Sequence, residues 1–306
     1  MILSKNETGL PINFVLKNTY KITGNISFSK ISIVYKAENI HTGEKFIIKE
    51  FYPCELVLRD LDNITVINRL SSTKNKFEEL KENFLQEALI LQQIIHRNIV
   101  KYIDHFKENG SIYIITEYYE GVLLDQYIKD CKLTKRHQLY NSIFFPLIKA
   151  LNYLHKKGII HRDIKPSNIM VDSKGNLKLL DFGSAIIYKL NSKHNIFITP
   201  GYSPLEQYSN SSKQGVVTDI YSFAATIYYS LTNVPPVDAP QRLIEDTLKN
   251  IKEYNGNISL IMSNTIMWSL AVNSKKRCFS LKFIMLSILL ENMITKIKCC
   301  FAEDNI

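Results

Sequence analysis

The fold is decided by one stretch of the sequence, residues 159–168, which reads IIHRDIKPSN. An acid, a cation and an amide follow one another closely there, at Asp163, Lys165 and Asn168. Further along, the triplet Asp181-Phe182-Gly183 comes directly after a second apolar segment. Solvated loop charges would explain either piece alone. Both pieces, in this order and at this spacing, predict one polar site that follows two short apolar strands.

The pairing resembles the catalytic loop and the metal-binding loop of eukaryotic-type (Hanks-type) serine/threonine protein kinases. The resemblance covers residues 20–298 and is weak near 55–76 and 241–265, where the sequence is poorly patterned. It implies an α+β, two-lobed protein kinase-like fold with a β-rich N-lobe and a helical C-lobe. It also implies that ATP and magnesium bind between the two lobes.

The same resemblance divides the chain into four parts. The N-lobe is expected at 20–118 and the C-lobe at 119–298, after an extended N-terminal arm at 1–19 and before a C-terminal tail at 299–306. Within the N-lobe, residues 54–76 are expected to form an insertion loop ahead of a helix.

Composition fits an ordinary globular protein, since the chain has 306 residues of which 45% are hydrophobic. Five cysteines in no CxxC or Cys/His pattern predict neither zinc nor a disulfide framework, which favours a reducing cytoplasm. The net charge of +9 suggests a nucleic-acid or acidic-lipid partner, but the lysines are dispersed and no such partner is expected. The N-terminus lacks a secretory signal. Phe283–Leu290 is too short to span a membrane and is predicted to be a buried helix.

Strands are expected at Tyr20–Ile22 and Ile31–Ala37, joined by the loop that covers the phosphates in protein kinases. The usual pattern of that loop is G-x-G-x-[FY]-G-x-V. Serines occupy all three glycine positions here, at Ser27, Ser29 and Ser32. A side chain at positive φ costs about 1 kcal/mol, so this departure predicts weakened or altered nucleotide binding. A plain strand connection with no ligand role is the alternative.

The next strand carries Lys49, at the place of the V-A-I-K lysine that holds the α- and β-phosphates. An edge charge on an apolar strand is the alternative for this lysine. Ile47 replaces the usual alanine and is expected to narrow the adenine pocket. A helix is predicted over Phe77–Ile95, with Ile95 on its apolar face and Glu87 at the border of that face. The resemblance makes Glu87 the ion-pair partner of Lys49.

The run Lys49–Pro53, with Arg59 soon after it, resembles a group of bacterial serine/threonine kinases. A later strand leads into the expected hinge, where Thr116 would gate the pocket and the backbone of Glu117 and Tyr119 would bind the adenine edge. The ATP-binding residues implied by the resemblance are Ile26, Ser27, Ser29, Ser32, Val34, Ile47, Lys49, Thr116, Glu117, Tyr119 and Met170.

The resemblance also implies the chemistry of the opening motif. Asp163 would accept the proton of the attacking hydroxyl, and Lys165, typical of the serine/threonine type, would neutralise the transferred phosphate. Asn168 and Asp181 would hold Mg²⁺, or Mn²⁺ in its place, because hard cations prefer oxygen ligands. The implied catalytic set is Asp163, Lys165, Lys49 and Glu87.

The activation segment is expected from Asp181 to Glu206, with Thr199, Ser203 and Glu206 as its marker positions. Arg162 pairs with a loop phosphate in related kinases, which motivates the hypothesis that this segment is phosphorylated. The candidate hydroxyls are those of Ser184, Ser192, Thr199 and Ser203.

Three further residues are expected to be structural. Arg277 matches the C-lobe arginine that pairs with Glu206, and Asp219 matches the buried aspartate that braces the catalytic loop. Arg162 belongs to the same loop. Helices are predicted at Asp125–Asp130 and from Gln138 to Lys157.

The resemblance implies transfer of the γ-phosphate of ATP to serine or threonine hydroxyls of proteins, including the chain itself. A pseudokinase, or ATP-binding scaffold, is the alternative that the loop serines raise, and a kinase of small molecules is another. Expected partners are protein substrates, with no nucleic acid and no membrane span. The sequence leaves open the oligomeric state, the physiological substrate, and delivery into another cell.

Overall fold

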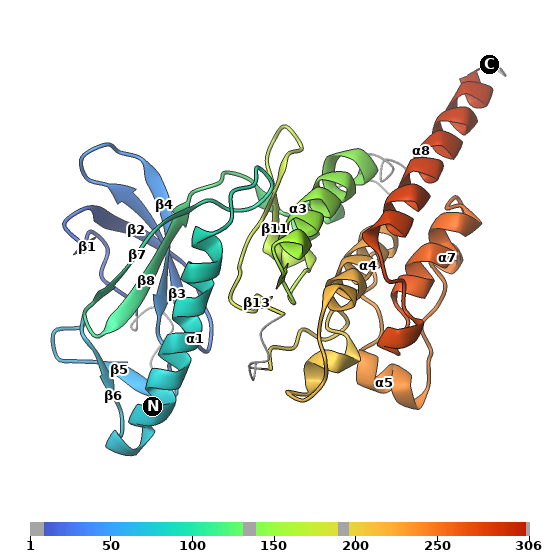
Figure 1. Cartoon of the computed structure of the whole chain (residues 1–306). Coiled ribbons are helices and arrows are strands. Elements are labelled where there is room, and N and C mark those ends of the chain that lie inside the picture. The colour runs from blue at the N-terminus through green and yellow to red at the C-terminus, as the bar shows by residue number, and fades with distance from the viewer. Residues whose placement is uncertain (1–8, 131–138, 189–195, 304–306) are drawn as a thin grey trace. The chain divides into compact units, whose positions relative to one another are not determined.

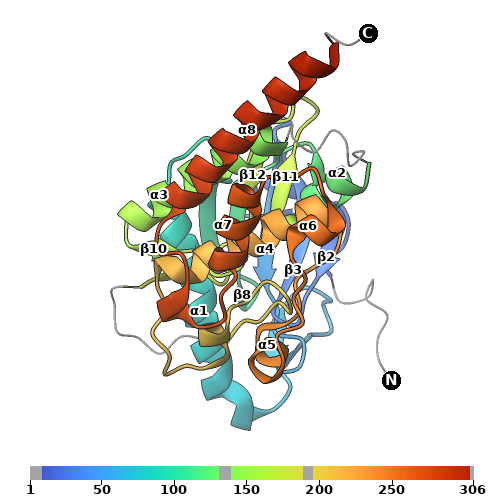
Figure 2. The ribbon, with the colours of Figure 1, turned by 90° about the vertical axis from the view of Figure 1, so that its right-hand side faces the viewer.

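The computed structural model describes residues 9–130, 139–188 and 196–303. Figures 1 and 2 show its ribbon from two directions. Two positions singled out from the sequence, Gln138 and Ser192, lie outside the described residues.

The chain forms two compact units. One holds the residues up to Ile95 together with Val100–Tyr119, and the other holds His96–Ile99 together with the residues from Glu120 onward. The segment His96–Ile99 falls inside the range expected for the N-lobe, yet it belongs to the second unit. A bridge that pairs Ile99 with Leu179 ties it there.

The first unit is built on a sheet with strand order β1-β2-β3-β4-β8-β7, in which every neighbouring pair is antiparallel. Its strands are β1 Val15–Leu16, β2 Tyr20–Phe28, β3 Ser32–Asn39, β4 Lys45–Phe51, β7 Tyr102–Glu108 and β8 Ser111–Glu117. Strand β1 lies in the segment expected to be an arm. It pairs with β2, and Leu16 is fully buried, so apolar burial holds this segment on the sheet.

Helix α1 (Lys74–Gln92) packs against this sheet (Figure 1). The ring of Phe51, at the end of β4, lies 5.3 Å from the rings of both Phe77 and Phe84. These aromatic contacts fix the helix beside the strand that carries Lys49.

The predicted end of this helix was wrong. Helix α1 ends at Gln92, and Ile95 is 88% exposed instead of lying on the apolar face. The N–H groups of Gln93 and Ile94 bond to carbonyls three residues earlier, which tightens the last turn and ends the helix.

The predicted insertion loop at 54–76 contains a hairpin of two short strands, β5 Val57–Arg59 and β6 Val66–Asn68. The carboxylate of Asp62 accepts the backbone N–H groups of Ile64 and Thr65 and forms the turn. An aspartate that bonds to the backbone two residues ahead is a common turn signal, but strands of three residues are too short to show alternation.

The second unit is mainly helical (Figure 2). Its helices are α2 Leu124–Asp130, α3 Phe145–Lys156, α4 Val216–Thr232, α5 Ala239–Ile244, α6 Ile251–Tyr254, α7 Leu260–Ser269 and α8 Leu281–Glu303, with a π-helical turn at Tyr140–Phe144 ahead of α3. Short strands β9 Val122–Leu123, β10 Ile159–Ile160, β11 Ile169–Val171, β12 Leu177–Leu179 and β13 Ile186–Ile187 carry the polar motifs. Helix α4 is buried along most of its length and forms the centre of this unit.

The region 241–265, where the sequence is poorly patterned and the resemblance is weak, is helical over much of its length. Helices α6 and α7 begin at side-chain caps, where Asn250 accepts the N–H of Lys252 and Ser259 accepts the N–H of Met262. Such caps are a sequence signal for helix starts. The caps are the main sequence signal for these two helices, because the helices are short and show little amphipathic pattern.

The segment Phe283–Leu290 lies within α8 but is buried on one face only, so the predicted buried helix needs correction. Ile284 and Ile288 are 0% exposed, whereas Phe283 and Leu286 are 39% and 52% exposed. A run of apolar residues in the sequence is compatible both with a fully buried helix and with a helix that exposes one apolar face, so the run alone does not distinguish them.

Candidate active site

In the first unit, Lys49 lies on β4 between Val34 of β3 and Ile114 of β8. Its Nζ is 2.8 Å from Glu87 Oε2 and 3.0 Å from Oε1, which is the pairing expected from the sequence. Glu87 is only 5% exposed, so it lies deeper than the border position expected for it. The ion pair holds the ammonium group at a fixed place on the sheet.

The neighbouring Glu50 forms a buried cluster that sequence reasoning missed. Its side chain is 0% exposed, and its two oxygens are 2.7 and 2.6 Å from the guanidinium of Arg59. Tyr35 and Tyr113 donate their hydroxyls to the same carboxylate at 2.5 and 3.0 Å. Burial opposes the charge of Arg59, but the bonds and charge of Glu50 raise its pKa above the ordinary value. The cluster therefore ties β3, β5 and β8 to β4 beside Lys49.

The expected hinge residues lie at the end of this unit. Thr116 pairs with Ile47 across β4 and β8, and the Glu117 carboxylate accepts the N–H of Lys101 at 2.8 Å. Tyr119 is the last residue of the unit. Met170, also expected to bind ATP, lies on β11 of the second unit opposite Leu123 of β9.

In the second unit, the carboxylate of Asp163 is held by three side chains. Thr199 donates its hydroxyl to Oδ1 at 2.8 Å, and Asn168 donates its amide to Oδ2 at 2.8 Å. The ammonium of Lys165 lies 2.8 Å from Oδ2 and 3.0 Å from the Thr199 hydroxyl. Thr199, which lies far from the motif in sequence, thus converges with Lys165 and Asn168 on one acidic group.

Asp181 directly follows Leu180, whose N–H donates to the carbonyl of Asn168 at 2.8 Å, so the two expected metal ligands lie on adjacent backbone. Asp181 is exposed and has a φ of 37°. Phe182 is 0% exposed and its ring packs edge-on against that of His161 at 4.7 Å. One amide and one carboxylate oxygen suit a hard divalent cation that draws its other ligands from phosphates and water. This donor set fits Mg²⁺.

Asp219 braces the loop that contains Asp163. Its carboxylate accepts the N–H groups of His161 and Arg162 at 2.9 and 2.8 Å and lies 2.8 Å from Nε2 of His155. Arg162 has a φ of 69°, an unfavourable conformation for a side chain of this size, which these bonds hold in place. Burial opposes the charge of Asp219, but His155 and the Arg162 N–H lower its pKa below the usual range.

Gln207 was also missed. It is 0% exposed and donates its amide to the Arg162 carbonyl at 2.8 Å, so it also holds the backbone of the residue whose N–H bonds to Asp219. Nothing in its sequence context marks it, because the bond spans 45 residues.

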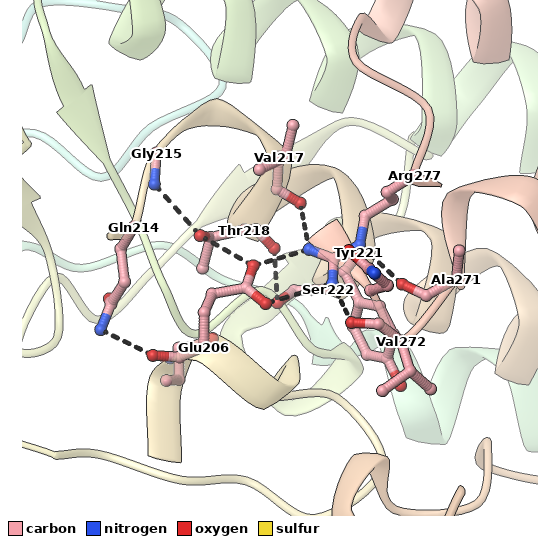
Figure 3. Close-up of polar contacts among 12 residues, drawn as sticks. Glu206, Gln214, Gly215, Val217, Thr218, Tyr221, Ser222, Ala271, Val272 and Arg277 are labelled. Atoms are coloured by element: carbon pink, nitrogen blue, oxygen red, sulfur yellow. Dashed lines mark hydrogen bonds and ion pairs between the residues drawn. The ribbon is translucent and has the colours of Figure 1, made fainter. Parts of the chain in front are cut away.

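The predicted pair of Glu206 and Arg277 is present and is drawn in Figure 3. The guanidinium makes two bonds to the carboxylate, at 2.6 and 3.1 Å, and Arg277 is 2% exposed. It also donates to backbone carbonyls of Ala271, Val217 and Val272. The pair joins the end of the activation segment to the loop ahead of α8.

The comparison with known proteins agrees with this geometry. The family model described as "Protein kinase domain" matches residues 20–288. The chain belongs to the protein kinase family. The family and the two-lobed fold expected from the sequence are thereby confirmed.

This kinase is similar to named kinases from Candida glabrata and Mus musculus. Serine/threonine-protein kinase STE20 of Candida glabrata is 31% identical over 232 residues, covering 74% of this chain and 24% of that protein. Sperm motility kinase 2B of Mus musculus is 29% identical over 196 residues, covering 63% of this chain and 40% of that protein. The kinase thus spans less than half of these relatives. A solved structure, "PpkA-294 apo form", has a TM-score of 0.78 at 28% identity and covers 92% of this chain and 99% of that one.

Among residues 9–130, 139–188 and 196–303, no helix is long and apolar enough to cross a membrane. The same residues contain no group of at least three His, Cys, Asp or Glu side chains that could hold a metal ion.

The phosphate-covering loop of the kinase differs from expectation in its backbone. Neither Ser27, Ser29 nor Ser32 has a positive φ, so the expected conformational cost of replacing glycine does not arise. Instead, the Ser29 hydroxyl accepts the N–H groups of Ile31 and Ser32 at 3.2 and 2.9 Å, and the Ser29 N–H donates to the Ser32 carbonyl at 2.8 Å. Ser29 and Ser32 close the turn between β2 and β3.

Replacing Ser29 by glycine is therefore expected to weaken this loop, although it restores the family pattern. We expect the loss of two to three hydrogen bonds, worth about 1 kcal/mol each, to raise the Kd for ATP by up to about 30- to 150-fold, measured by calorimetric titration. Ser72→Gly is the matched control, since Ser72 is exposed in the turn ahead of α1, lies outside the expected ATP-binding residues and should change the Kd little. Tighter ATP binding by Ser29→Gly would contradict the prediction.

Three of the four candidate phosphorylation sites lie in the described residues. Ser203 is 2% exposed and accepts the N–H of Thr199 at 2.9 Å, and the hydroxyl of Thr199 is bonded to Asp163. Ser184 is 9% exposed. These three hydroxyls are held within the folded segment, and Ser192 lies outside the described residues.

A cavity of about 260 Å³ lies next to the Asp163 cluster within the second unit. Its lining residues are Asp125, Lys165, Pro166, Ser167, Thr199, Tyr202 and Tyr229. Because Lys165 and Thr199 also contact Asp163, a side chain bound in this cavity would be close to the candidate catalytic group.

Proposed function

We propose that this chain is an ATP-dependent serine/threonine protein kinase that phosphorylates proteins, itself included. The observation that carries the proposal is the convergence of Thr199, Lys165 and Asn168 on the carboxylate of Asp163. Phosphoryl transfer needs fixed positions and charge neutralisation more than covalent catalysis, and this cluster supplies both. We assign residues 20–298 as the kinase domain, with an N-lobe at 20–118 and a C-lobe at 119–298.

Asp163 would accept the hydroxyl proton of the substrate. An ionised carboxylate has about four acceptor positions, of which Lys165 and Asn168 use the two on Oδ2 and Thr199 uses one on Oδ1. The remaining position on Oδ1 would bind the substrate hydroxyl, and the proton would move to that oxygen as the hydroxyl attacks.

The cations of the chain would bind the phosphates. Lys165 lies beside Asp163 and would neutralise the transferred group, while Lys49, fixed by Glu87, would hold the α- and β-phosphates. Asn168 and Asp181 would hold Mg²⁺, or Mn²⁺ in its place, through their oxygens. When bound, the metal supplies positive charge that orients the phosphates and stabilises their developing charge.

The free thiols of Cys54 and Cys278 are consistent with a cytoplasmic protein. Arg162 next to Asp163 is consistent with activation by phosphorylation between residues 184 and 203. Mass spectrometry of active protein that finds no phosphate in that segment would exclude this mode of activation.

The test is transfer of labelled γ-phosphate from ATP-magnesium by the wild-type protein, with protein substrates, autophosphorylation and small-molecule alcohols assayed in parallel. The proposal expects label in protein serine or threonine and none after chelation of the metal by EDTA. Label in small alcohols alone would indicate a small-molecule kinase. An unlabelled protein that ATP still stabilises against heat would be a pseudokinase, and either result would overturn the proposal.

A further inference from the structure

Helix α8 has two apolar faces. Leu281, Ile284 and Ile288 are at most 2% exposed and dock the helix on its own unit. A second stripe points outward, at Phe283, Leu286, Leu290 and Met293, which are 39%, 52%, 41% and 60% exposed. One buried face is enough to hold a helix on a core, so the exposed area of the outward stripe is not needed to dock α8 on its own unit.

The outward stripe has the spacing of a helix-pairing seam. Its members are three, four and three residues apart, which is the alternation of a and d positions in a heptad. This repeat keeps the same side chains on one line along a partner helix. A scattered set of exposed apolar residues would not keep it.

Helix α7 extends the same surface. The ring of Trp268 lies 5.4 Å from Phe283 and 6.2 Å from Phe279, and Phe279 and Phe283 are 5.2 Å apart. At the other end of α7, the N–H of Ser259 bonds to the carboxylate of Glu291, so the two helices run antiparallel. Figure 2 shows them side by side.

We call this the α7–α8 face. It consists of Leu260, Ile261, Trp268, Phe279, Phe283, Leu286, Leu289, Leu290 and Met293, all 37–66% exposed. Taking roughly 200 Å² for a large apolar residue, its exposed area is on the order of 1,000 Å². The largest apolar patch of a typical monomer is about 300–600 Å², and a stable interface buries about 800 Å² on each partner.

We propose that the α7–α8 face binds a second copy of this chain, with α8 pairing antiparallel to the α8 of the partner. The stripe is self-complementary. A two-fold axis midway between Leu286 and Leu290 sets Leu286 against the partner's Leu290 and Phe283 against the partner's Met293. Antiparallel helix pairs bring a and d positions together in this way, and a closed dimer needs such an isologous surface.

The opposite face of α8 argues against a lipid partner. A helix that lies in a membrane surface exposes a charged face opposite its apolar one, whereas the face of α8 opposite the stripe is buried in the unit. None of the residues of the α7–α8 face carries a charge that a second copy would have to desolvate.

The first test is the mass of the chain in solution by sedimentation over roughly 1–100 µM, where a dimer of ordinary affinity dissociates on dilution. Leu286→Glu and Leu290→Lys are each expected to raise the dimer Kd by at least about 30-fold, as for loss of a central contact residue. Leu61→Glu is the matched control, since Leu61 is 99% exposed and lies in the other unit. Melting temperatures would show that each variant is folded.

A mixture of Leu286→Glu and Leu290→Lys tests the antiparallel register. In that register the new carboxylate of one chain meets the new ammonium of the other, so the mixture is expected to dimerise where each variant alone does not. Three results would overturn the proposal: a wild-type monomer at all concentrations, a dimer that neither variant weakens, or a wild-type monomer that sediments with anionic lipid vesicles.

Discussion

Replacing Asp163 by asparagine is expected to lower kcat for phosphoryl transfer by about 10²–10⁴-fold, the range for loss of a positioned general base. Asparagine has nearly the same shape but cannot accept the hydroxyl proton. Its amide would also face the ammonium of Lys165, which lies 2.8 Å from Oδ2 in the wild type. The substitution therefore removes both the base and the charge that fixes Lys165.

The measurement should separate chemistry from binding. The KM for ATP is expected to change by less than about 3-fold, because Asp163 would act on the hydroxyl and not on the nucleotide. Asp130→Asn is the matched control, since Asp130 is exposed at the end of α2 in the same unit. A variant with unchanged kcat would show that Asp163 is not the base, and a proportional rise in KM would place its role in binding.

Contacts between motif residues could be predicted from the sequence, because the family resemblance assigns a partner to each motif residue. Lys49 with Glu87 and Glu206 with Arg277 were expected as pairs and are present at 2.8 and 2.6 Å. In both cases the resemblance named the partner, and the sequence has residues of opposite charge at the two positions. The roles of these two pairs in catalysis and stability remain predictions.

The buried cluster around Glu50 could not be predicted in this way. Alternation along β4 counts a glutamate as polar and gives no reason to place it at 0% exposure. Its partners Tyr35, Arg59 and Tyr113 come from three other strands, and only the folded sheet brings them to one carboxylate. The cost of burying that charge is offset by contacts that are far apart in sequence.

The phosphate-covering loop and α8 were predicted incorrectly for local reasons. The serines were expected to strain the loop, but a hydroxyl that bonds to nearby N–H groups gives the turn another way to close. In α8, the apolar run from Phe283 to Leu290 belongs to two faces that point in different directions. The hydropathy of the run counts the apolar residues of both faces together and does not show that one of the faces is exposed.

Replacing Arg277 by methionine is expected to destabilise the protein by about 3–5 kcal/mol, since it leaves the buried Glu206 carboxylate without its cation. The Thr218 hydroxyl, 3.2 Å from that carboxylate, can offset only part of the loss. At about 2–4 °C per kcal/mol for a domain of this size, the melting temperature should fall by roughly 6–20 °C. Thermal unfolding followed by circular dichroism gives this value directly.

A control and a double variant separate the ion pair from the other bonds of Arg277. Arg242→Met removes another buried arginine, but its partner Asp246 is 50% exposed and stays solvated, so the loss should be smaller. Adding Glu206→Gln to Arg277→Met should recover the cost of the unpaired charge but not that of the carbonyls of Val217, Ala271 and Val272. The coupling between the two substitutions then measures the pair alone. If the double variant is no more stable than Arg277→Met, the arginine stabilises this unit through the backbone carbonyls and not through Glu206.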